Sequence, residues 1–409
     1  MIENRDIVCF GLQPWDLDIA FTLKYTAIEM SKKNRVLFLN PPILRGDLIR
    51  HGNHSRLAYR KAVLKGEKPD LFKYNDNLWV FTPRKVIESI NWIPFAKVHD
   101  KLNWVNDRRF ASEAKRAINE LGFKDYILFD DNSMLIGFYL KELLQPWFAV
   151  YLLRDAVLQV PYHAKHGTRL EPDLIRKMDL MVANSDYFAD YGKKYNKHAY
   201  MIGQGCDLSL YDVNDPDIQI PDDLKAITKK PIIGYVGALT TIRLDIQVLV
   251  HIAKSRPDWS VVLVGPEDED FKASELHNLE NVYFLGRKDP KMLPGYIKGF
   301  DVALNPQIIN PITDVNYPLK IDEYLAMGKA TVATRTTFMD YFKDYTYLPY
   351  TKEEYVTEIE KALNEDSEEK QQARIAFAST HTWENFVQKI YDHIERIAHE
   401  QGKIASDEI

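Results

Sequence analysis

The chain has 409 residues, of which 45 % are hydrophobic and 27 % charged, and its formal net charge is −6. This length predicts two globular domains of ordinary size, each able to bury its own core. The composition excludes a disulfide-rich scaffold and a structural zinc site, because Cys9 and Cys206 are the only cysteines.

The beginning of the chain predicts no signal peptide. The segment MIENRDIVCFGL enters a strand almost immediately and carries three charged residues. No apolar run approaches the ~18 residues that a membrane span needs. We therefore expect a cytoplasmic protein, or one that is peripheral to the inner face of the plasma membrane.

The net charge is unevenly distributed. Residues 1–205 contain 31 Lys/Arg and 24 Asp/Glu, a balance of +7, whereas residues 206–409 contain 22 and 35, a balance of −13. This asymmetry indicates that the two halves face different partners.

Apolar strands alternate with helical patterns along most of the chain, which predicts an α/β protein with parallel sheets. The expected strands of the first half lie at 6–11, 35–39, 78–82, 126–130, 147–153 and 179–185, with a helix over 19–33. Those of the second half lie at 231–237, 259–265, 282–286, 301–306 and 329–334. The Asp/Pro-rich piece 211–223 is the best linker candidate. Residues 383–399 have the apolar spacing of a helix.

In the first half, the loop after the first strand has the sequence GLQPWDLD, with Gly11, Gln13, Trp15 and Asp16. A later segment, YLLRDAVLQVPYHAKHGT, places Asp155 at a strand end. Asp155 is a candidate ligand-binding residue or general base, and the alternative is a helix or turn cap. Arg154, His163 and His166 lie nearby in sequence. The pair at 130–131 is a second candidate carboxylate site, or a loop feature.

Two segments, 44–68 and 84–109, are basic and interleaved with apolar residues. They hold seven and six Lys/Arg, and the second includes Trp92, Phe95 and Trp104. Such surfaces suit an anionic membrane face. The alternative is a solvated face with core-facing aromatic residues. Nucleic acid is not expected as a partner, because no recognition motif accompanies the charge.

The stretch NYPLKIDEYLAMGKATVAT, Asn316–Thr334, combines a loop, a helix that begins near Lys320 and Glu323, Gly328 and a β-branched strand. A helix N-terminus in an α/β sheet suits an anionic group such as a diphosphate, and Lys320 adds a positive charge there. Glu323, one turn later, can accept hydrogen bonds from ribose hydroxyls. The alternative is an ordinary amphipathic helix that packs on a sheet.

This stretch resembles the nucleotide-sugar-binding motif of GT-B glycosyltransferases, in the large retaining family that includes bacterial glycogen synthase and many envelope-polysaccharide enzymes. The resemblance implies two Rossmann-like domains whose parallel sheets face each other across a cleft, and a C-terminal helix that crosses back to the first domain. On this basis we expect an acceptor-binding domain at 1–207, a donor-binding domain at 208–382 and that helix within 383–409.

Further segments match the family pattern in order. GYVGALTTIR places Gly237 at a strand end and Arg243 where the family commonly has a basic residue for the donor diphosphate, although Leu244 replaces the usual glycine. The loops after the next two strands would bring Gly265 to the donor, and Gly286 with Arg287 to the nucleobase. The alternative for Arg243 is a surface arginine that opens a helix, and the alternative for Gly265 is simple strand termination. The implied donor-binding set is Gly237, Gly265, Gly286, Arg287, Asn316, Lys320 and Glu323, and the implied catalytic set is Asp155, Lys320 and Arg243. The implied acceptor-side set is Gly11, Gln13, Trp15, Asp16, Arg154 and His163, and Asp155 would bind the acceptor or, if the reaction inverts configuration, act as the general base.

The chain departs from the family pattern at one position. Retaining members usually carry an acidic residue eight positions before the helix glutamate, where it contacts sugar hydroxyls, but this chain has Val315 there. Asn316 or Asp314 would have to substitute, so the sequence leaves open whether the reaction retains or inverts configuration.

We therefore expect a glycosyltransferase that moves a hexosyl group from a nucleotide-sugar donor, expected to be a UDP-sugar, to a glycan or lipid-linked acceptor in bacterial polysaccharide biosynthesis. No cofactor is expected, and no metal, because the helix N-terminus, Lys320 and Arg243 suffice to neutralise the departing diphosphate. The Asp-x-Asp at 16–18 is interpreted as coincidental. Two alternatives remain, a nucleotide-sugar 2-epimerase of the same fold and a non-catalytic nucleotide-sugar-binding module. An NAD-dependent enzyme is disfavoured, because no G-x-G-x-x-G follows the first strand.

Overall fold

The chain divides into two compact units in the computed structural model, which describes residues 2–17, 21–50, 57–311 and 313–403. Unit 1 consists of residues 1–205 and 383–409, and unit 2 consists of residues 206–382. The sequence predicts the first boundary two residues later and a linker at 211–223. Residues 211–223 lie within unit 2.

Unit 1 is built on a sheet with the described strand order β3-β4-β2-β1-β5-β6-β7-β8. Its strands are β1 (Asp6–Gly11), β2 (Arg35–Leu39), β3 (Leu71–Asn75), β4 (Leu78–Phe81), β5 (Ile127–Asp131), β6 (Phe148–Leu153), β7 (Leu180–Ala183) and β8 (Ala199–Met201). Neighbouring strands are parallel except at the edge, where β3 pairs antiparallel with β4. The apolar pattern of the sequence predicts neither β3 nor β8.

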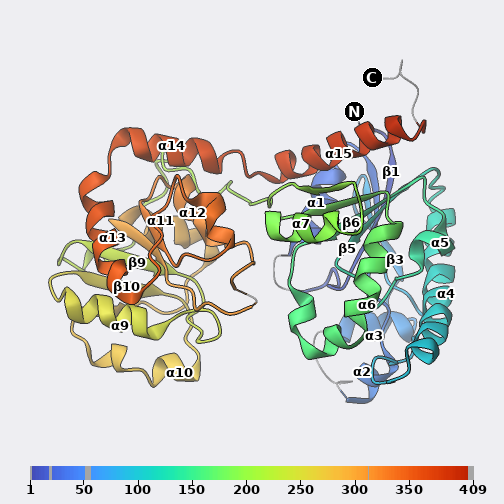
Figure 1. Ribbon diagram of the computed structural model, residues 1–409, viewed down its shortest axis with the longest axis horizontal. Coiled ribbons are helices and arrows are strands. Elements are labelled where there is room, and N and C mark those ends of the chain that lie inside the picture. The colour runs from blue at the N-terminus through green and yellow to red at the C-terminus, as the bar shows by residue number, and fades with distance from the viewer. Residues whose placement is uncertain (1, 18–20, 51–56, 312, 404–409) are drawn as a thin grey trace. The chain divides into compact units, whose positions relative to one another are not determined.

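Helices cover both faces of this sheet. They are α1 (Thr22–Met30), α2 (Arg45–Arg50), α3 (Ala58–Leu64), α4 (Ala96–Glu120), α5 (Leu140–Leu144), α6 (Pro161–Lys177), α7 (Asp186–Lys193) and α15 (Trp383–Glu400). On one face, α1 and α15 lie side by side, and Ile390 of α15 is fully buried in the same core as Cys9 of β1 (Figure 1). On the opposite face, Phe110 of α4 packs against Phe10, with ring centroids 4.9 Å apart.

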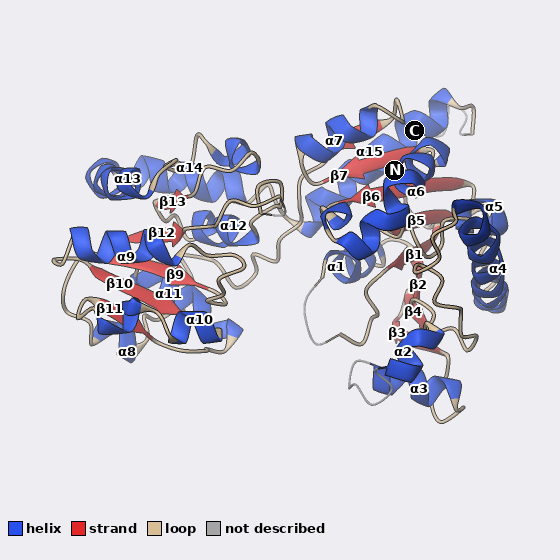
Figure 2. Cartoon of the chain, turned by 60° about the horizontal axis from the view of Figure 1, so that its bottom comes forward, coloured by secondary structure: helices blue, strands red, loops and turns tan. Residues whose placement is uncertain are grey.

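Unit 2 is built on a fully parallel sheet with the described order β11-β10-β9-β12-β13 (Figure 2). Its strands are β9 (Ile232–Val236), β10 (Ser260–Val264), β11 (Val282–Phe284), β12 (Val302–Asn305) and β13 (Thr331–Ala333). Its helices are α8 (Asp222–Lys225), α9 (Ile246–Ser255), α10 (Glu269–Lys272), α11 (Leu293–Gly299), α12 (Leu319–Ala326), α13 (Lys352–Glu365) and α14 (Glu368–Ala378).

The side chains of β9 alternate between two cores. Ile232 and Val236 lie in the core that α11 and α12 cover, whereas Ile233 and Tyr235 lie in the core that α9 and α13 cover. A strand with both faces buried and connected by helices is the doubly wound arrangement. The predicted α/β class with two sheets of parallel strands is therefore confirmed. None of the described helices is both long and apolar enough to cross a bilayer.

Candidate functional site

Each sheet has one point at which the strand order reverses. In unit 2 this point lies between β9 and β12, since β10 and β11 lie on one side and β13 on the other. In unit 1 it lies between β1 and β5. Ligands of doubly wound sheets bind outside the carboxyl ends of the strands at such points. The residues predicted for the donor and the acceptor follow these strand ends.

In unit 2, Gly237 and Gly265 pack against each other immediately after β9 and β10. Their φ angles are +143° and +156°, a region that favours glycine. A Cβ atom on Gly265 would lie 1.8 Å from the carbonyl oxygen of Gly237, which leaves no room for any side chain. Both glycines are therefore required by the backbone of this edge of the sheet.

The side chain of Lys320 lies against Gly237. It is in the first turn of α12, and a Cβ atom on Gly237 would be 2.3 Å from its Cε and 2.6 Å from its Nζ. Its Nζ is 5.4 Å from the ring centroid of Tyr235. The structure thus brings together Gly237, Gly265 and Lys320. An ammonium group beside a glycine backbone at a helix N-terminus is a suitable environment for an anion.

Glu323 faces the segment that enters unit 2. It is half-buried, and its carboxylate accepts a hydrogen bond from the hydroxyl of Tyr211. Burial raises the pKa of Glu323, while the Lys320 ammonium and the Tyr211 hydrogen bond oppose that shift. The carboxylate can therefore accept hydrogen bonds while a cation lies nearby. Sequence spacing does not indicate the contact with Tyr211.

The remaining donor-side candidates lie on exposed loops at the carboxyl edge. Arg243 is exposed in the turn after β9, where its carbonyl oxygen accepts a 2.9 Å hydrogen bond from the N–H of Ile308. Gly286 follows β11 with φ +68°, and Arg287 beside it is exposed. No contact in the described part of the chain joins Arg243 or Arg287 to Lys320.

The three residues around position 315 have different environments. Val315 is 6 % exposed and belongs to the core. Asp314 accepts hydrogen bonds from the backbone N–H and the hydroxyl of Thr337, both at 2.8 Å. Asn316 has a buried Oδ1 without a hydrogen-bond partner among the described residues. Of the two substitutes considered for the missing acid, Asn316 is thus the one with an available polar atom.

In unit 1, Arg154 is the centre of a polar cluster at the switch point. Its Nε donates to Asp131 at 2.9 Å, its Nη2 donates to Gln13 Oε1 at 3.1 Å, and its Nη1 donates to Asp155. The Asp131 side chain is 3 % exposed, whereas that of Asp155 is 42 % exposed. Burial raises the pKa of Asp131, and the Arg154 guanidinium opposes that shift. Asp155 is therefore the carboxylate of this cluster that solvent and a ligand can reach.

The other acceptor-side candidates have mixed environments. Gly11 packs on Asp131, since a Cβ there would lie 3.2 Å from the Asp131 carbonyl oxygen. Trp15 is buried, and its ring packs against Phe38 at a centroid distance of 5.1 Å. His163 is half-buried, and burial lowers its pKa.

The loop with the Asp-x-Asp sequence is only partly described. Asp16 is half-buried. Burial of Arg60 lowers the pKa of that guanidinium, and the negative charge of Asp16 opposes the shift. Asp18 lies outside the described residues. Within the described ranges, no three His, Cys, Asp or Glu side chains are grouped as a metal site would require.

Sequence reasoning missed Glu171. It lies in the middle of α6, is 2 % exposed, and receives hydrogen bonds from the hydroxyls of Tyr151 and Tyr191. Burial, partly opposed by these hydrogen bonds, raises its pKa to about 7. Glu171 and Asp155 line the same small pocket of about 70 Å³, whose walls are largely apolar. Only the tertiary packing of α6 on β6 reveals this acid.

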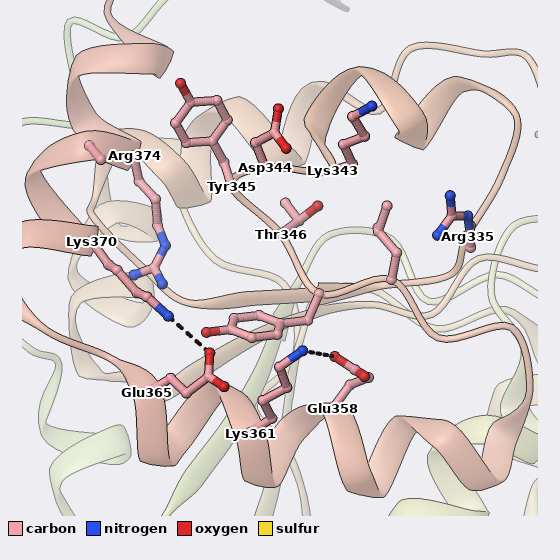
Figure 3. Close-up of a pocket in the computed structure, with 13 residues that line it drawn as sticks. Arg335, Lys343, Asp344, Tyr345, Thr346, Glu358, Lys361, Glu365, Lys370 and Arg374 are labelled. Carbon is pink, nitrogen blue, oxygen red and sulfur yellow. Dashed lines mark hydrogen bonds and ion pairs between the residues drawn. The ribbon is translucent and has the colours of Figure 1, made fainter.

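A separate pocket of about 410 Å³ lies among α13, α14 and the 343–348 segment (Figure 3). Two lysines that line it are paired with carboxylates, Lys370 with Glu365 at 2.9 Å and Lys361 with Glu358 at 3.8 Å. None of the residues predicted for the donor or the acceptor lines it.

Comparison with known proteins supports a relationship to glycosyltransferases. Residues 230–365, which include the loops and α12 described above, match the family model described as glycosyl transferases group 1. A Bacillus subtilis protein named "Putative teichuronic acid biosynthesis glycosyltransferase TuaH" is 28 % identical over 226 residues. That match covers 51 % of this chain and 55 % of the relative, so the chain spans about half of the relative's length.

Solved structures show the fold. Sucrose-phosphate synthase from Thermosynechococcus elongatus aligns with 97 % of this chain and 100 % of its own, with a TM-score of 0.63 and 15 % identity. HepE from Anabaena, solved in complex with UDP, aligns with 96 % of this chain and 100 % of its own, with a TM-score of 0.63 and 14 % identity. The predicted resemblance to GT-B glycosyltransferases and the GT-B fold are confirmed.

The buried acid Glu171 generates a pH-dependent prediction. An unfolded glutamate ionises near 4.5, whereas the folded group holds its proton until about pH 7. The folded state therefore binds more protons in this window, and the free energy of unfolding falls as pH rises through it, by roughly 3 kcal/mol. We expect the Tm of Glu171→Gln to approach that of the wild type near pH 4.5 and to exceed it increasingly up to pH 7. The measurement is thermal unfolding across this range.

The control for this prediction is Glu120→Gln, at the exposed end of α4. Its Tm difference from the wild type should be small throughout. A Tm difference for Glu171→Gln that does not change with pH would show that the folded protein ionises Glu171 normally.

Proposed function

We propose that the chain is a glycosyltransferase that transfers a hexosyl group from a UDP-sugar to a glycan or lipid-linked acceptor in bacterial polysaccharide biosynthesis. The observation that carries the proposal is the meeting of Gly237, Gly265 and Lys320 at the switch point of unit 2. These residues lie within the segment that matches the group 1 family model. The complex of HepE with UDP supports the choice of nucleotide.

In this proposal, the donor diphosphate lies at the N-terminus of α12. The two glycines let backbone N–H groups approach the phosphate oxygens, and Lys320 supplies the countercharge. Fixed charge of this kind stabilises the UDP leaving group as the glycosidic bond breaks, without a metal ion. Arg243 assists from the exposed turn after β9. Glu323 accepts hydrogen bonds from the ribose hydroxyls, and Asn316 takes the sugar-contacting role that Val315 cannot fill.

We assign the acceptor to the polar cluster around Arg154. The exposed carboxylate of Asp155 accepts a hydrogen bond from the acceptor hydroxyl. Because Arg154 also contacts Asp131 and Gln13, the guanidinium is held in place and fixes the orientation of Asp155. Such positioning favours attack by one hydroxyl of the acceptor over its neighbours.

Replacement of Lys320 tests the donor assignment and the function together. The assay measures UDP release with and without acceptor glycans, after UDP-, GDP- and dTDP-sugars have been compared as donors. Lys320→Ala should lower kcat/KM for the UDP-sugar, since a charge-assisted contact in the site is lost. The expected decrease corresponds to about 2–4 kcal/mol of lost transition-state stabilisation. Lys254→Ala, an exposed lysine near the end of α9, should leave the reaction unchanged.

Wild-type turnover by Lys320→Ala would contradict the donor assignment. Nucleotide-sugar conversion that needs no acceptor would instead support a 2-epimerase, and UDP binding without any turnover would support a binding module.

A second prediction concerns Glu323 and the ribose. Glu323→Gln retains the shape of the side chain but loses the charged acceptor. The Kd of UDP should therefore rise, by an amount that corresponds to about 1–3 kcal/mol of lost binding free energy. The same substitution should leave the Kd of 2′,3′-dideoxy-UDP almost unchanged, because that ligand lacks the hydroxyls. Calorimetry measures both, and Glu368→Gln on the exposed face of α14 is the control. Equal losses for the two ligands would remove Glu323 from the ribose site.

We also propose that unit 1 docks on an anionic membrane surface. Three large hydrophobic residues in the two basic segments are strongly exposed, Ile49 at 78 %, Trp92 at 73 % and Phe95 at 70 %. Lys97 and Lys101 of α4 follow Phe95 and are exposed. Apolar side chains beside basic ones match the interface of an anionic bilayer. Residues 51–56, within the first basic segment, lie outside the described residues.

Tyr162 extends this surface. It is 53 % exposed, and its carbonyl oxygen accepts a hydrogen bond from Asn91, the residue before Trp92. Trp104 contributes less, since it is 37 % exposed and its ring packs edge-on against Tyr139 at 4.9 Å. The docking surface is thus formed by Ile49, Trp92, Phe95, Lys97, Lys101 and Tyr162.

The test is co-sedimentation with anionic phosphatidylglycerol vesicles and neutral phosphatidylcholine vesicles. The wild type should sediment with the anionic vesicles at low salt, since each surface Lys or Arg contributes about 1 kcal/mol. The double variant Trp92→Ser/Phe95→Ser should sediment less at every salt concentration. Tyr350→Ser, which removes a side chain that is 65 % exposed in unit 2, is the control. Equal recovery in the supernatant with both lipids would mean that the basic surface only keeps the protein in solution.

A further inference from the structure

Asp322 lies between the donor-side residues of α12, yet its side chain points into the protein. It is fully buried, and its Oδ1 is 2.7 Å from Nδ1 of His381, which is 3 % exposed. The other ring nitrogen of His381 is 2.9 Å from the hydroxyl of Tyr341. A buried carboxyl group is unfavourable unless it is paired, so this hydrogen-bonded arrangement specifies the position of both side chains.

His381 also lies where the chain leaves unit 2. The boundary falls between residues 382 and 383, and the entry boundary falls between 205 and 206. The backbone N–H of Cys206 donates to the carbonyl oxygen of His381 at 2.8 Å, and Cys206 forms a β-bridge with Thr382. The entering and leaving segments are therefore hydrogen-bonded to each other, and His381 joins them to α12.

Two other contacts fix α12 at different points along its length. The hydroxyl of Tyr324 accepts a 3.0 Å hydrogen bond from the backbone N–H of Val236, at the end of β9. The guanidinium of Arg374, on α14, donates at 3.0 Å to the carbonyl oxygen of Gly328, which follows the helix. These contacts set the axial position of α12. Of these three contacts, the one made by Asp322 is nearest to Lys320 in sequence.

We propose that Asp322 and His381 are positioning residues for the nucleotide-sugar donor, which they serve by fixing the rotation of α12 about its axis. Residues 320 and 323 are three positions apart and share one side of the helix, while residue 322 projects about 100° away from 323. Rotation of this eight-residue helix would therefore displace the Lys320 ammonium and the Glu323 carboxylate together. The inference rests on the proposed function, because it assumes that these two groups bind the donor.

Through the hydrogen bond between Cys206 and His381, the same pair also links α12 to the backbone of the entering and leaving segments. The competing account is that the pair contributes only to the stability of unit 2. The two accounts differ in one respect. A purely stabilising pair can be lost without any change in the geometry of Lys320 and Glu323 in the molecules that remain folded.

The experiment compares Asp322→Ala and Asp322→Asn with Asn281→Ala. Asn281 is a matched control, because it is also a buried, hydrogen-bonded polar residue of unit 2. It lies directly before β11, at the amino edge of the sheet, and its Nδ2 donates to the carbonyl oxygens of Ala253, Arg256 and Trp259. For each folded variant, the measurements are the Tm, the Kd of UDP and the backbone amide exchange of residues 319–327.

We expect Asp322→Ala to raise the Kd of UDP at least tenfold and to accelerate exchange in 319–327. Asn281→Ala should lower the Tm and leave both other quantities unchanged. Asp322→Asn retains a hydrogen-bonding group of the same size and should recover most of the affinity. If Asp322→Ala does not fold, His381→Asn provides the same comparison.

A lowered Tm with an unchanged Kd and unchanged exchange in the Asp322 and His381 variants would overturn the inference. If the wild type binds no UDP, the proposed function fails. The exchange of 319–327 then still decides whether the pair positions α12.

Discussion

The close approach of Gly265 to Gly237 is the constraint on which the unit 2 site depends. The two strand ends can converge this closely only because Gly265 carries no side chain, and both φ angles lie where glycine is favoured. The space beside Gly237, where a side chain would otherwise lie, is occupied by the end of the Lys320 side chain. A side chain at position 265 would push the two loops apart, and a side chain at position 237 would displace the Lys320 ammonium group. The chemistry proposed for the donor is thus a consequence of backbone packing.

Much of the fold and part of the site were predictable from local patterns. The alternation of apolar strands and helices predicted the succession of β9 to β13 along the chain. Parallel strands necessarily bring their carboxyl ends to one edge of the sheet. The convergence of Gly237, Gly265 and Lys320 follows from that rule. The edge strand β3 was missed because its residues are half-buried or exposed, and β8 because three residues carry too little pattern.

The buried polar groups were not predictable in the same way. Asp322 pairs with a histidine 59 positions later, and Glu171 is surrounded by Tyr151 and Tyr191 only after α6 and α7 pack on the sheet. Sequence spacing carries no information about such partners, because each depends on tertiary contacts. The polar cluster of unit 1 falls between these cases. Both Arg154 and the carboxylates at 130–131 were identified as candidates, but their contact was not.

The position of α15 has a consequence for the synthesis of the protein on the ribosome. Unit 1 contains the first 205 residues, but Ile390 and Ile394 of α15 complete the core that α1 and β1 begin. During translation, this face of unit 1 stays uncovered until all of unit 2 has been made. Unit 2 is continuous in sequence and can finish folding first, although domains generally fold in N-terminal to C-terminal order. A nascent chain truncated before residue 383 would therefore expose apolar surface on its earlier half, where chaperones bind and where aggregation begins.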